Sequence, residues 1–199
     1  ELAEKILIGT RELNSFITNL LDFARPLKLI RKKENFSDIM NKAISFSMSY
    51  PKNKPGQIKI KKCYEDKIIH YIDGQLLFRL FLNILINAYE AMEGNGTCFI
   101  RISKIRNIKK IKKADKTIKS LNYSESQPFA LISIRDTGPG ISKDFLEKIF
   151  NPFITSKTFG TGLGLPMVQK IVEAFNGRID VITSTGKGTE FKCFIPLGD

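Results

Sequence analysis

Two asparagines, Asn83 and Asn87, stand four residues apart in the otherwise largely apolar segment FLNILINAYEAM at 81–92. At that spacing the two carboxamides lie one above the other on the same face of a helix. A neutral amide oxygen is a hard ligand for Mg²⁺ and adds no negative charge beside a triphosphate. The pair therefore indicates a magnesium and phosphate site; the structural alternative is that both amides satisfy neighbouring backbone groups.

A second chemically suggestive position lies in ISIRDTGPGIS at 132–142. The apolar run predicts a strand that delivers Asp136 to a turn, in which Gly138 and Gly140 permit positive φ and let a flat ligand approach the backbone. A carboxylate at this point can accept a hydrogen bond from an exocyclic amine. The alternative is a common Asp-Thr-Gly turn between a strand and a helix.

A third motif is the glycine repeat in GTGLGLPMVQKIV at 160–172. Its glycines precede an amphipathic pattern, so that free backbone amides and a helix N-terminus can hold phosphates. The spacing differs from the GxxxxGK[ST] of a P-loop, and no strand directly precedes it as in a dinucleotide-binding fold. The repeat is weak evidence alone, but together the three motifs indicate one nucleotide pocket.

Length and composition predict an ordinary globular domain with an appendage. The chain has 199 residues, of which 42% are hydrophobic and 26% charged, enough for one core. The longest apolar run, Leu76 to Ala91, is interrupted by Arg79 and the two asparagines, and falls short of the about 20 apolar residues that a membrane span needs. Because the chain starts at Glu1 without a signal-peptide core, we expect a cytoplasmic part of a longer protein, with any membrane anchor upstream.

Cysteine content fits a reducing compartment. Cys63, Cys98 and Cys193 are odd in number and far apart, which matches neither a disulfide framework nor a zinc-ligand spacing. We expect all three to be reduced core residues.

The net charge of +12 is concentrated in one segment. Nine Lys or Arg residues fall between Arg101 and Lys119, against the single acid Asp115. No aromatic residue interleaves them, so the stacking platform of a single-strand nucleic-acid binder is missing. The segment is interpreted as a solvated lysine-rich loop, and docking to an anionic surface or partner is the alternative.

The first 25 residues carry apolar side chains in alternating steps of four and three, with Gly9 in the one missing place. This heptad pattern predicts a helix that ends at Pro26 and packs against another helix in a bundle or coiled coil. The seam consists of Leu2, Ile6, Leu13, Phe16, Leu20 and Phe23.

The rest of the chain alternates between helical and strand patterns, which predicts an α+β fold in the form of a two-layer α/β sandwich. A broad apolar face on the helix that follows Asp73 indicates burial against a sheet. Helices are expected from Phe36, from Asp73, near 143–150 and near 163–175, and strands at 57–64, 67–72, about 97–105, 128–135 and in the final pair GRIDVITS and TEFKCFIP.

With these motifs in this order, residues from about 36 to 199 resemble the ATP-binding domain of bacterial sensor histidine kinases, within the superfamily that also contains gyrase, heat-shock-90 and mismatch-repair ATPases. NPFITSK followed closely by GTGLGL is most similar to the nitrogen-regulation branch. The resemblance is carried by Asn83–Ala91, Asp136–Gly140, Phe150–Phe153, Gly160–Gly164 and the sequence GKGT at 186–189.

The resemblance implies a role for individual residues toward ATP and Mg²⁺. It implies that Asn87 ligates the metal and that Asn83 faces the phosphates. Asp136 would receive the adenine amino group, supported by Thr189. The other implied ATP-binding residues are Gly138, Gly140, Lys157, Gly160, Thr161, Gly162, Leu163 and Gly164.

Two further features follow from the same resemblance. Residues 154–161 would act as a short lid over ATP. Gyrase-like hydrolases carry a glutamate where this chain has Asn83, so water activation is disfavoured here.

The resemblance also divides the chain into two parts. Residues 1–27, with NSFITNLLDFARPLKL at 14–29, are similar to the second helix of the dimerisation and phosphoacceptor hairpin. Residues 28–199 would form the catalytic domain, with a basic hairpin insertion at about 104–127. The first helix of that hairpin, with its phosphoacceptor histidine, is absent. The single histidine, His70, is not followed by an acid and is expected to be structural.

The implied function is transfer of the γ-phosphoryl group of Mg-ATP to a histidine outside these residues, for relay to an aspartate of a response regulator. Expected partners are the phosphoacceptor helix of the full-length protein, the receiver domain and a second copy in a homodimer; nucleic acid is not expected. One alternative is a serine-directed kinase of the anti-sigma type, against which the bundle-like helix at 1–25 argues. Another is a nucleotide-dependent interaction module without phosphotransfer.

Overall fold

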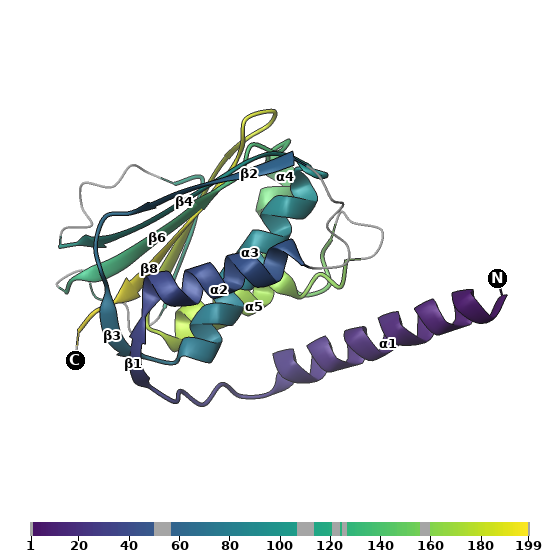
Figure 1. Cartoon of the computed structure of the whole chain (residues 1–199), viewed down its shortest axis with the longest axis horizontal. Helices are drawn as coiled ribbons and strands as arrows, with labels where there is room; N and C mark the ends of the chain where they lie inside the picture. The colour runs from purple at the N-terminus through teal and green to yellow at the C-terminus, as the bar shows by residue number, and fades with distance from the viewer. Residues whose placement is uncertain are drawn as a thin grey trace.

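The computed structural model describes residues 2–49, 57–106, 114–120, 124, 127–155 and 160–198. Within them, helix α1 (Leu2–Ala24) projects from an α/β body, to which it is joined by an extended segment (Figure 1). The body consists of a sheet with helices packed on one face. This arrangement confirms the predicted two-layer sandwich.

The main sheet contains six described strands in the order β2-β4-β6-β8-β7-β5. Strands β2 and β4 run parallel, and the other neighbours are antiparallel. At the centre, Ile102, Ile132 and Cys193 stand side by side and are fully buried. A separate antiparallel pair joins β1 (Lys32–Asn35) to β3 (Ile69–Ile72). The six strands are β2 (Gln57–Tyr64), β4 (Asn95–Ile105), β5 (Lys116–Lys119), β6 (Phe129–Arg135), β7 (Arg178–Ser184) and β8 (Gly188–Pro196).

Helix α3 (Gly74–Ala91) is central to the helical layer, because it contacts both α2 (Phe36–Met48) and α5 (Gly164–Ala174). It begins where Asp73 Oδ1 accepts hydrogen bonds from the backbone amides of Gln75 and Leu76, each at 3.0 Å, which satisfies donors that lack a partner within the helix. A short helix, α4 (Lys143–Leu146), follows the turn after β6. The core face of α3 consists of Leu77, Leu80, Phe81, Ile84 and Leu85, all buried.

The lysine-rich segment differs from the expected solvated loop. Strands β4 and β6, which flank it, are antiparallel neighbours as in a hairpin. Residues 116–119 lie between these two strands in the sequence. In the structure, however, they form β5 at the far edge of the sheet, where β5 pairs with β7. The sequence KTIK is too short and too charged to show a strand pattern, and backbone pairing with an existing strand supplies the stabilisation. Residues 107–113, 121–123 and 125–126 lie outside the described part of the chain.

Helix α1 ends at Ala24, as predicted from Pro26. Of its heptad seam, Leu13 is 59% and Phe16 36% exposed. Phe23 instead packs against the core of the body. The side chains of Leu2 and Ile6 lie outside the described part, so bundle packing of this helix stays a prediction.

The cysteine expectation is correct for two residues and wrong for the third. All three are free, and Cys98 and Cys193 are buried in the sheet. Burial, followed by the nearby Asp136 carboxylate, raises the pKa of Cys98 to about 12. Cys63 is exposed because its side chain lies on the opposite face of the sheet from Ile58 and Ile60 of the same strand, which pack against the core. None of the described helices is long and apolar enough to cross a membrane.

Strand β5 contributes to a buried ionic contact that makes the insertion part of the fold. Asp180 is fully buried, and its carboxylate accepts hydrogen bonds from Arg178 Nε at 2.7 Å, Arg178 Nη2 at 2.6 Å and Thr117 Oγ1 at 2.8 Å.

We expect Arg178→Ala to lower the free energy of unfolding by about 3 kcal/mol or more, because it leaves a buried carboxylate without its counter-charge. The matched control is Arg101→Ala, which breaks the exposed pair with Glu65 (3.2 Å) and should cost less than about 1 kcal/mol. Urea denaturation measures both, and equal losses would contradict the assignment.

Candidate functional site

A cavity of about 340 Å³ lies between α3 and the loop that leads into α5. Both sides of the cavity include residues that the sequence had singled out. The amides come from the exposed face of α3 and the glycines from the loop. The predicted site residues that line it are Asn83, Asn87, Gly160, Thr161, Gly162, Leu163 and Gly164.

The N-terminus of α5 lies directly over the two asparagines. A Cβ placed on Gly164 would lie 3.5 Å from Asn83 Oδ1 and 3.7 Å from Asn87 Nδ2. Leu163, at the N-cap position, provides no capping side chain, so the first amides of this helix are not satisfied by a cap. A helix N-terminus facing two carboxamides across a cavity is suited to an anionic ligand.

The loop before α5 is held by contact with the segment after the short helix α4. Gly162 has φ +66°, and a Cβ there would lie 2.6 Å from the carbonyl carbon of Phe153. Phe153 itself has φ +67° and its amide donates to Gly162 O at 3.1 Å. The aromatic and glycine motifs therefore form one backbone contact. Half of the proposed lid, residues 156–159 with Lys157 among them, lies outside the described part of the chain.

Asp136 and its neighbours form a second group, which does not line this cavity. Asp136 is 3% exposed, and its Oδ1 accepts from Gly138 N at 2.8 Å and Thr189 N at 3.2 Å. Burial raises the pKa of Asp136, an effect that the two backbone donors oppose. Thr189 Oγ1 lies 3.1 Å from Thr183 Oγ1. Three predicted residues of this group, Asp136, Gly138 and Thr189, thus meet around one buried carboxylate.

Two glycines allow the β7–β8 turn to approach the Asp136 turn. Gly140 has φ +75°, and a Cβ there would overlap the carbonyl oxygen of Ser184. Gly188 has φ +87°, and a Cβ there would overlap the carbonyl oxygen of Asp136. Side chains at either position would separate the two turns, so glycine is required for contact as well as for conformation.

Helix α3 connects the two groups. At Gly138, a Cβ would lie 3.1 Å from Ala91 O, so the Asp136 turn sits at the C-terminal end of this helix. Asn87 and Asn83 precede Ala91 by one and two turns, or about 6 and 12 Å of helical rise. An elongated ligand with an amine at one end and anionic groups at the other matches this order.

Three polar lining residues were not identified from the sequence. Arg79 and Glu90 lie on the same face of α3 as the asparagines, and their spacing of four before Asn83 and three after Asn87 could have indicated them. Asn19 comes from α1, and no local pattern could have placed it there. Arg79 and Glu90 are the charged residues among the described lining.

The amide oxygens in the cavity suit a hard cation such as Mg²⁺ that is coordinated mainly by the phosphates of a bound molecule and by water. Among the residues that the structure describes, no three His, Cys, Asp or Glu side chains gather as a metal site. Mg²⁺ commonly takes one or two protein oxygens and completes its shell with phosphates and water. The amide oxygens of Asn83 and Asn87 fit this mode.

A two-layer sandwich with this cavity and this buried carboxylate defines an ATP-binding domain of the histidine-kinase type. The chain belongs to the family described as histidine kinase-, DNA gyrase B-, and HSP90-like ATPase, whose model matches residues 72–199. This membership confirms the resemblance noted in the sequence.

Two curated relatives are kinases, in agreement with the family match. Sporulation kinase E of Bacillus subtilis (strain 168) is 31% identical over 187 residues, covering 94% of this chain and 22% of that protein. The sensory histidine kinase/phosphatase NtrB of Rhodobacter capsulatus is 28% identical over 198 residues, covering 99% of this chain and 52% of that protein. The chain thus spans between about a fifth and a half of these relatives.

Among solved structures, full-length ShkA in complex with AMPPNP superposes with a TM-score of 0.70 at 22% identity, covering 98% of this chain and 39% of that one. This likeness supports the fold.

The two glycines of the β7–β8 turn allow a matched test of the Asp136 turn. Gly188→Ala should destabilise the protein by more than about 2 kcal/mol, because positive φ and overlap with Asp136 add together, and it should abolish adenine-nucleotide binding. Gly186→Ala shares the positive φ (+76°) but meets nothing within 4 Å, so it should cost about 1 kcal/mol and leave affinity unchanged. Thermal unfolding and calorimetric titration measure both effects; equal behaviour of the two variants would refute the close approach as the reason for Gly188.

Proposed function

We propose that this chain is the catalytic, ATP-binding part of a sensor histidine kinase, which transfers the γ-phosphoryl group of Mg-ATP to a histidine outside these residues. The observation that carries the proposal is the position of Asn83 and Asn87 opposite the N-terminus of α5 across one cavity. Relay of the phosphoryl group to an aspartate of a response regulator belongs to the same proposal.

Each residue has a distinct role in this proposal. Asp136 accepts a hydrogen bond from the adenine amino group, with Thr189 fixing the carboxylate. The amide of Asn87 holds Mg²⁺, which would neutralise phosphate charge. Asn83 faces the phosphates, as do the backbone amides of Gly162 to Gly164. Lys157 is proposed as a further phosphate ligand on sequence grounds alone.

Chemistry in this site consists of positioning and charge neutralisation. Phosphoryl transfer needs little covalent participation from the protein, and the described cavity lining offers no cysteine, serine or histidine nucleophile. Asn83 carries an amide and cannot remove a proton from water. Retention of the phosphoryl group for an incoming histidine is therefore favoured over hydrolysis.

The exposed heptad residues of α1 support the proposed dimer. Leu13 and Phe16 present apolar surface that a complete hairpin and a second copy would bury. We further propose a cytoplasmic location, where ATP and a receiver domain are available.

The magnesium role of Asn87 is tested by calorimetric titration with a non-hydrolysable ATP analogue, with and without Mg²⁺, and with GTP. The unaltered chain should bind the ATP analogue more tightly with Mg²⁺ and in preference to GTP. Asn87→Ala should weaken the magnesium-dependent affinity by about tenfold or more, while Asn41→Ala, at an exposed asparagine on α2, should leave it unchanged. Equal affinities of Asn87→Ala and the unaltered chain would remove the assignment.

Phosphotransfer is tested by supplying a separate phosphoacceptor helical hairpin with labelled ATP. Label on the histidine supports the kinase. Tight ATP binding without transfer would favour the nucleotide-dependent interaction module instead.

The raised pKa of Asp136 predicts a pH dependence of adenine recognition. The ionised carboxylate accepts from the adenine amino group, so AMP affinity should fall as pH decreases through the carboxyl pKa. Because burial raises that pKa, the fall should begin at a higher pH than for an ordinary aspartate. Asp136→Asn should bind AMP weakly with a flatter profile, which also reports any titration of the nucleotide itself. Parallel profiles for the two proteins would contradict the role of Asp136.

A further inference from the structure

We infer that Arg79 recognises the terminal phosphate of the nucleotide, and that Asp22 of α1 competes with ATP for this guanidinium. The inference rests on the proposed function, because it names a further specificity residue of the same cavity. It also predicts that docking of α1 and binding of ATP oppose each other.

The position of Arg79 on α3 supports the first part. Arg79 lines the cavity together with Asn83 and Asn87, and the three residues follow one another at intervals of four. Measured along the helix axis from Ala91, at the proposed adenine end, Asn87 lies at about 6 Å, Asn83 at about 12 Å and Arg79 at about 18 Å. Arg79 is therefore one turn beyond Asn83, at the end of the cavity where the last phosphate of an extended triphosphate would lie.

Charge singles out the same residue. Arg79 is the one positively charged side chain among the described lining of the cavity, and Glu90 adds a negative charge to it. A guanidinium can make two parallel hydrogen bonds to a phosphate, which gives both energy and orientation. A group at this place would distinguish a triphosphate from a monophosphate.

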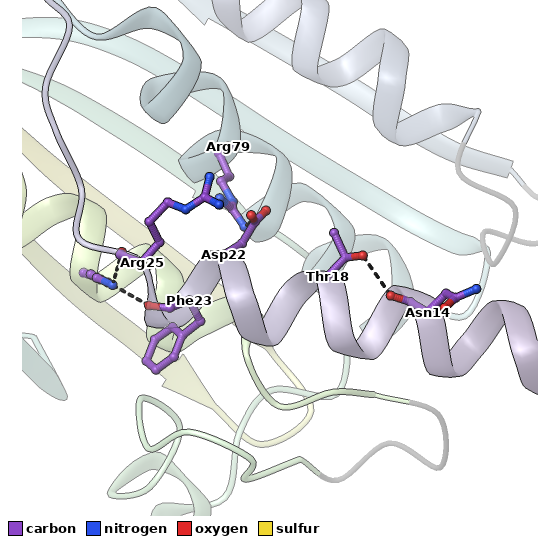
Figure 2. Close-up of polar contacts among 7 residues, drawn as sticks. Asn14, Thr18, Asp22, Phe23, Arg25 and Arg79 are labelled. Atoms are coloured by element: carbon purple, nitrogen blue, oxygen red, sulfur yellow. Dashed lines mark hydrogen bonds and ion pairs between the residues drawn. The ribbon is translucent and has the colours of Figure 1, made fainter.

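Arg79 is already engaged by α1. Its Nη2 lies 2.9 Å from Asp22 Oδ2, and the two side chains are 31% and 41% exposed (Figure 2). An ion pair this exposed contributes little net stability, so a phosphate can displace the carboxylate. Asp22 therefore acts as an intramolecular competitor.

A second contact anchors α1 independently of the cavity. Lys170 Nζ, on α5, donates to the carbonyl oxygens of Phe23 and Arg25, the latter at 2.9 Å, and lies 5.3 Å from the centroid of the Phe23 ring. Lys170 does not line the cavity. Two sets of polar contacts thus hold the end of α1, in addition to the packing of Phe23. One of them shares Arg79 with the nucleotide site, and linkage makes the competition reciprocal.

The test is calorimetric titration of the whole chain and its variants with the Mg²⁺ complex of a non-hydrolysable ATP analogue and, separately, with AMP. Arg79→Gln should weaken binding of the ATP analogue about tenfold and that of AMP less than twofold. Asp22→Asn should strengthen binding of the ATP analogue by about two- to fivefold and leave AMP unchanged. In the Arg79→Gln background, Asp22→Asn should have no effect, because the two residues act through one interaction.

Lys170→Gln is the matched control, since it loosens α1 without removing the partner of Arg79. It should raise the ratio of ATP-analogue to AMP affinity by less than Asp22→Asn does, because Asp22 still competes for Arg79. If Lys170→Gln strengthens ATP binding as much as Asp22→Asn does, release of α1 rather than of Arg79 is responsible and the competition is refuted. If Arg79→Gln weakens both ligands equally, recognition of the terminal phosphate is refuted. Failure of the unaltered chain to bind either nucleotide would instead overturn the proposed function.

Discussion

Burial of one face of α3 is the constraint on which the site depends. Its apolar residues lie against the sheet and leave the helix no freedom to rotate about its axis, since rotation would expose them. The opposite face therefore presents Arg79, Asn83 and Asn87 at fixed positions along a single line. The packing of α3 in the core therefore also fixes the positions of the side chains that face the cavity.

Backbone contacts through glycine then bring two loops to the ends of that line. At Gly162 and Gly188, a side chain would collide with the backbone of another segment, so these loops approach more closely than any other residue would allow. One contact closes the proposed phosphate end and the other surrounds Asp136 at the proposed adenine end. The apolar sandwich supplies rigidity, while the polar groups come from the places where chain segments meet.

Local patterns were sufficient to predict the elements that carry the nucleotide motifs, because helix period, strand alternation and glycine turns are encoded within a few residues of each other. Features that depend on distant partners were not predicted. Strand β5 has no strand pattern of its own and forms because β7 offers a free edge. The contact between Asp22 and Arg79 joins residues 57 positions apart. Cys63 was misplaced because its exposure depends on which face of the sheet the helices cover.

The dependence on distant partners also explains why the sequence described α1 less completely than the other elements. Its heptad seam indicates a helical partner, yet its last turn faces the catalytic domain, where Phe23 joins the core and Lys170 binds its terminal carbonyls. One end of the helix thus belongs to the nucleotide domain and the remainder is exposed. A helix attached in this way can transmit a change in the proposed bundle to the cavity without a long pathway, because Asn19 and Arg79, the partner of Asp22, already line the cavity.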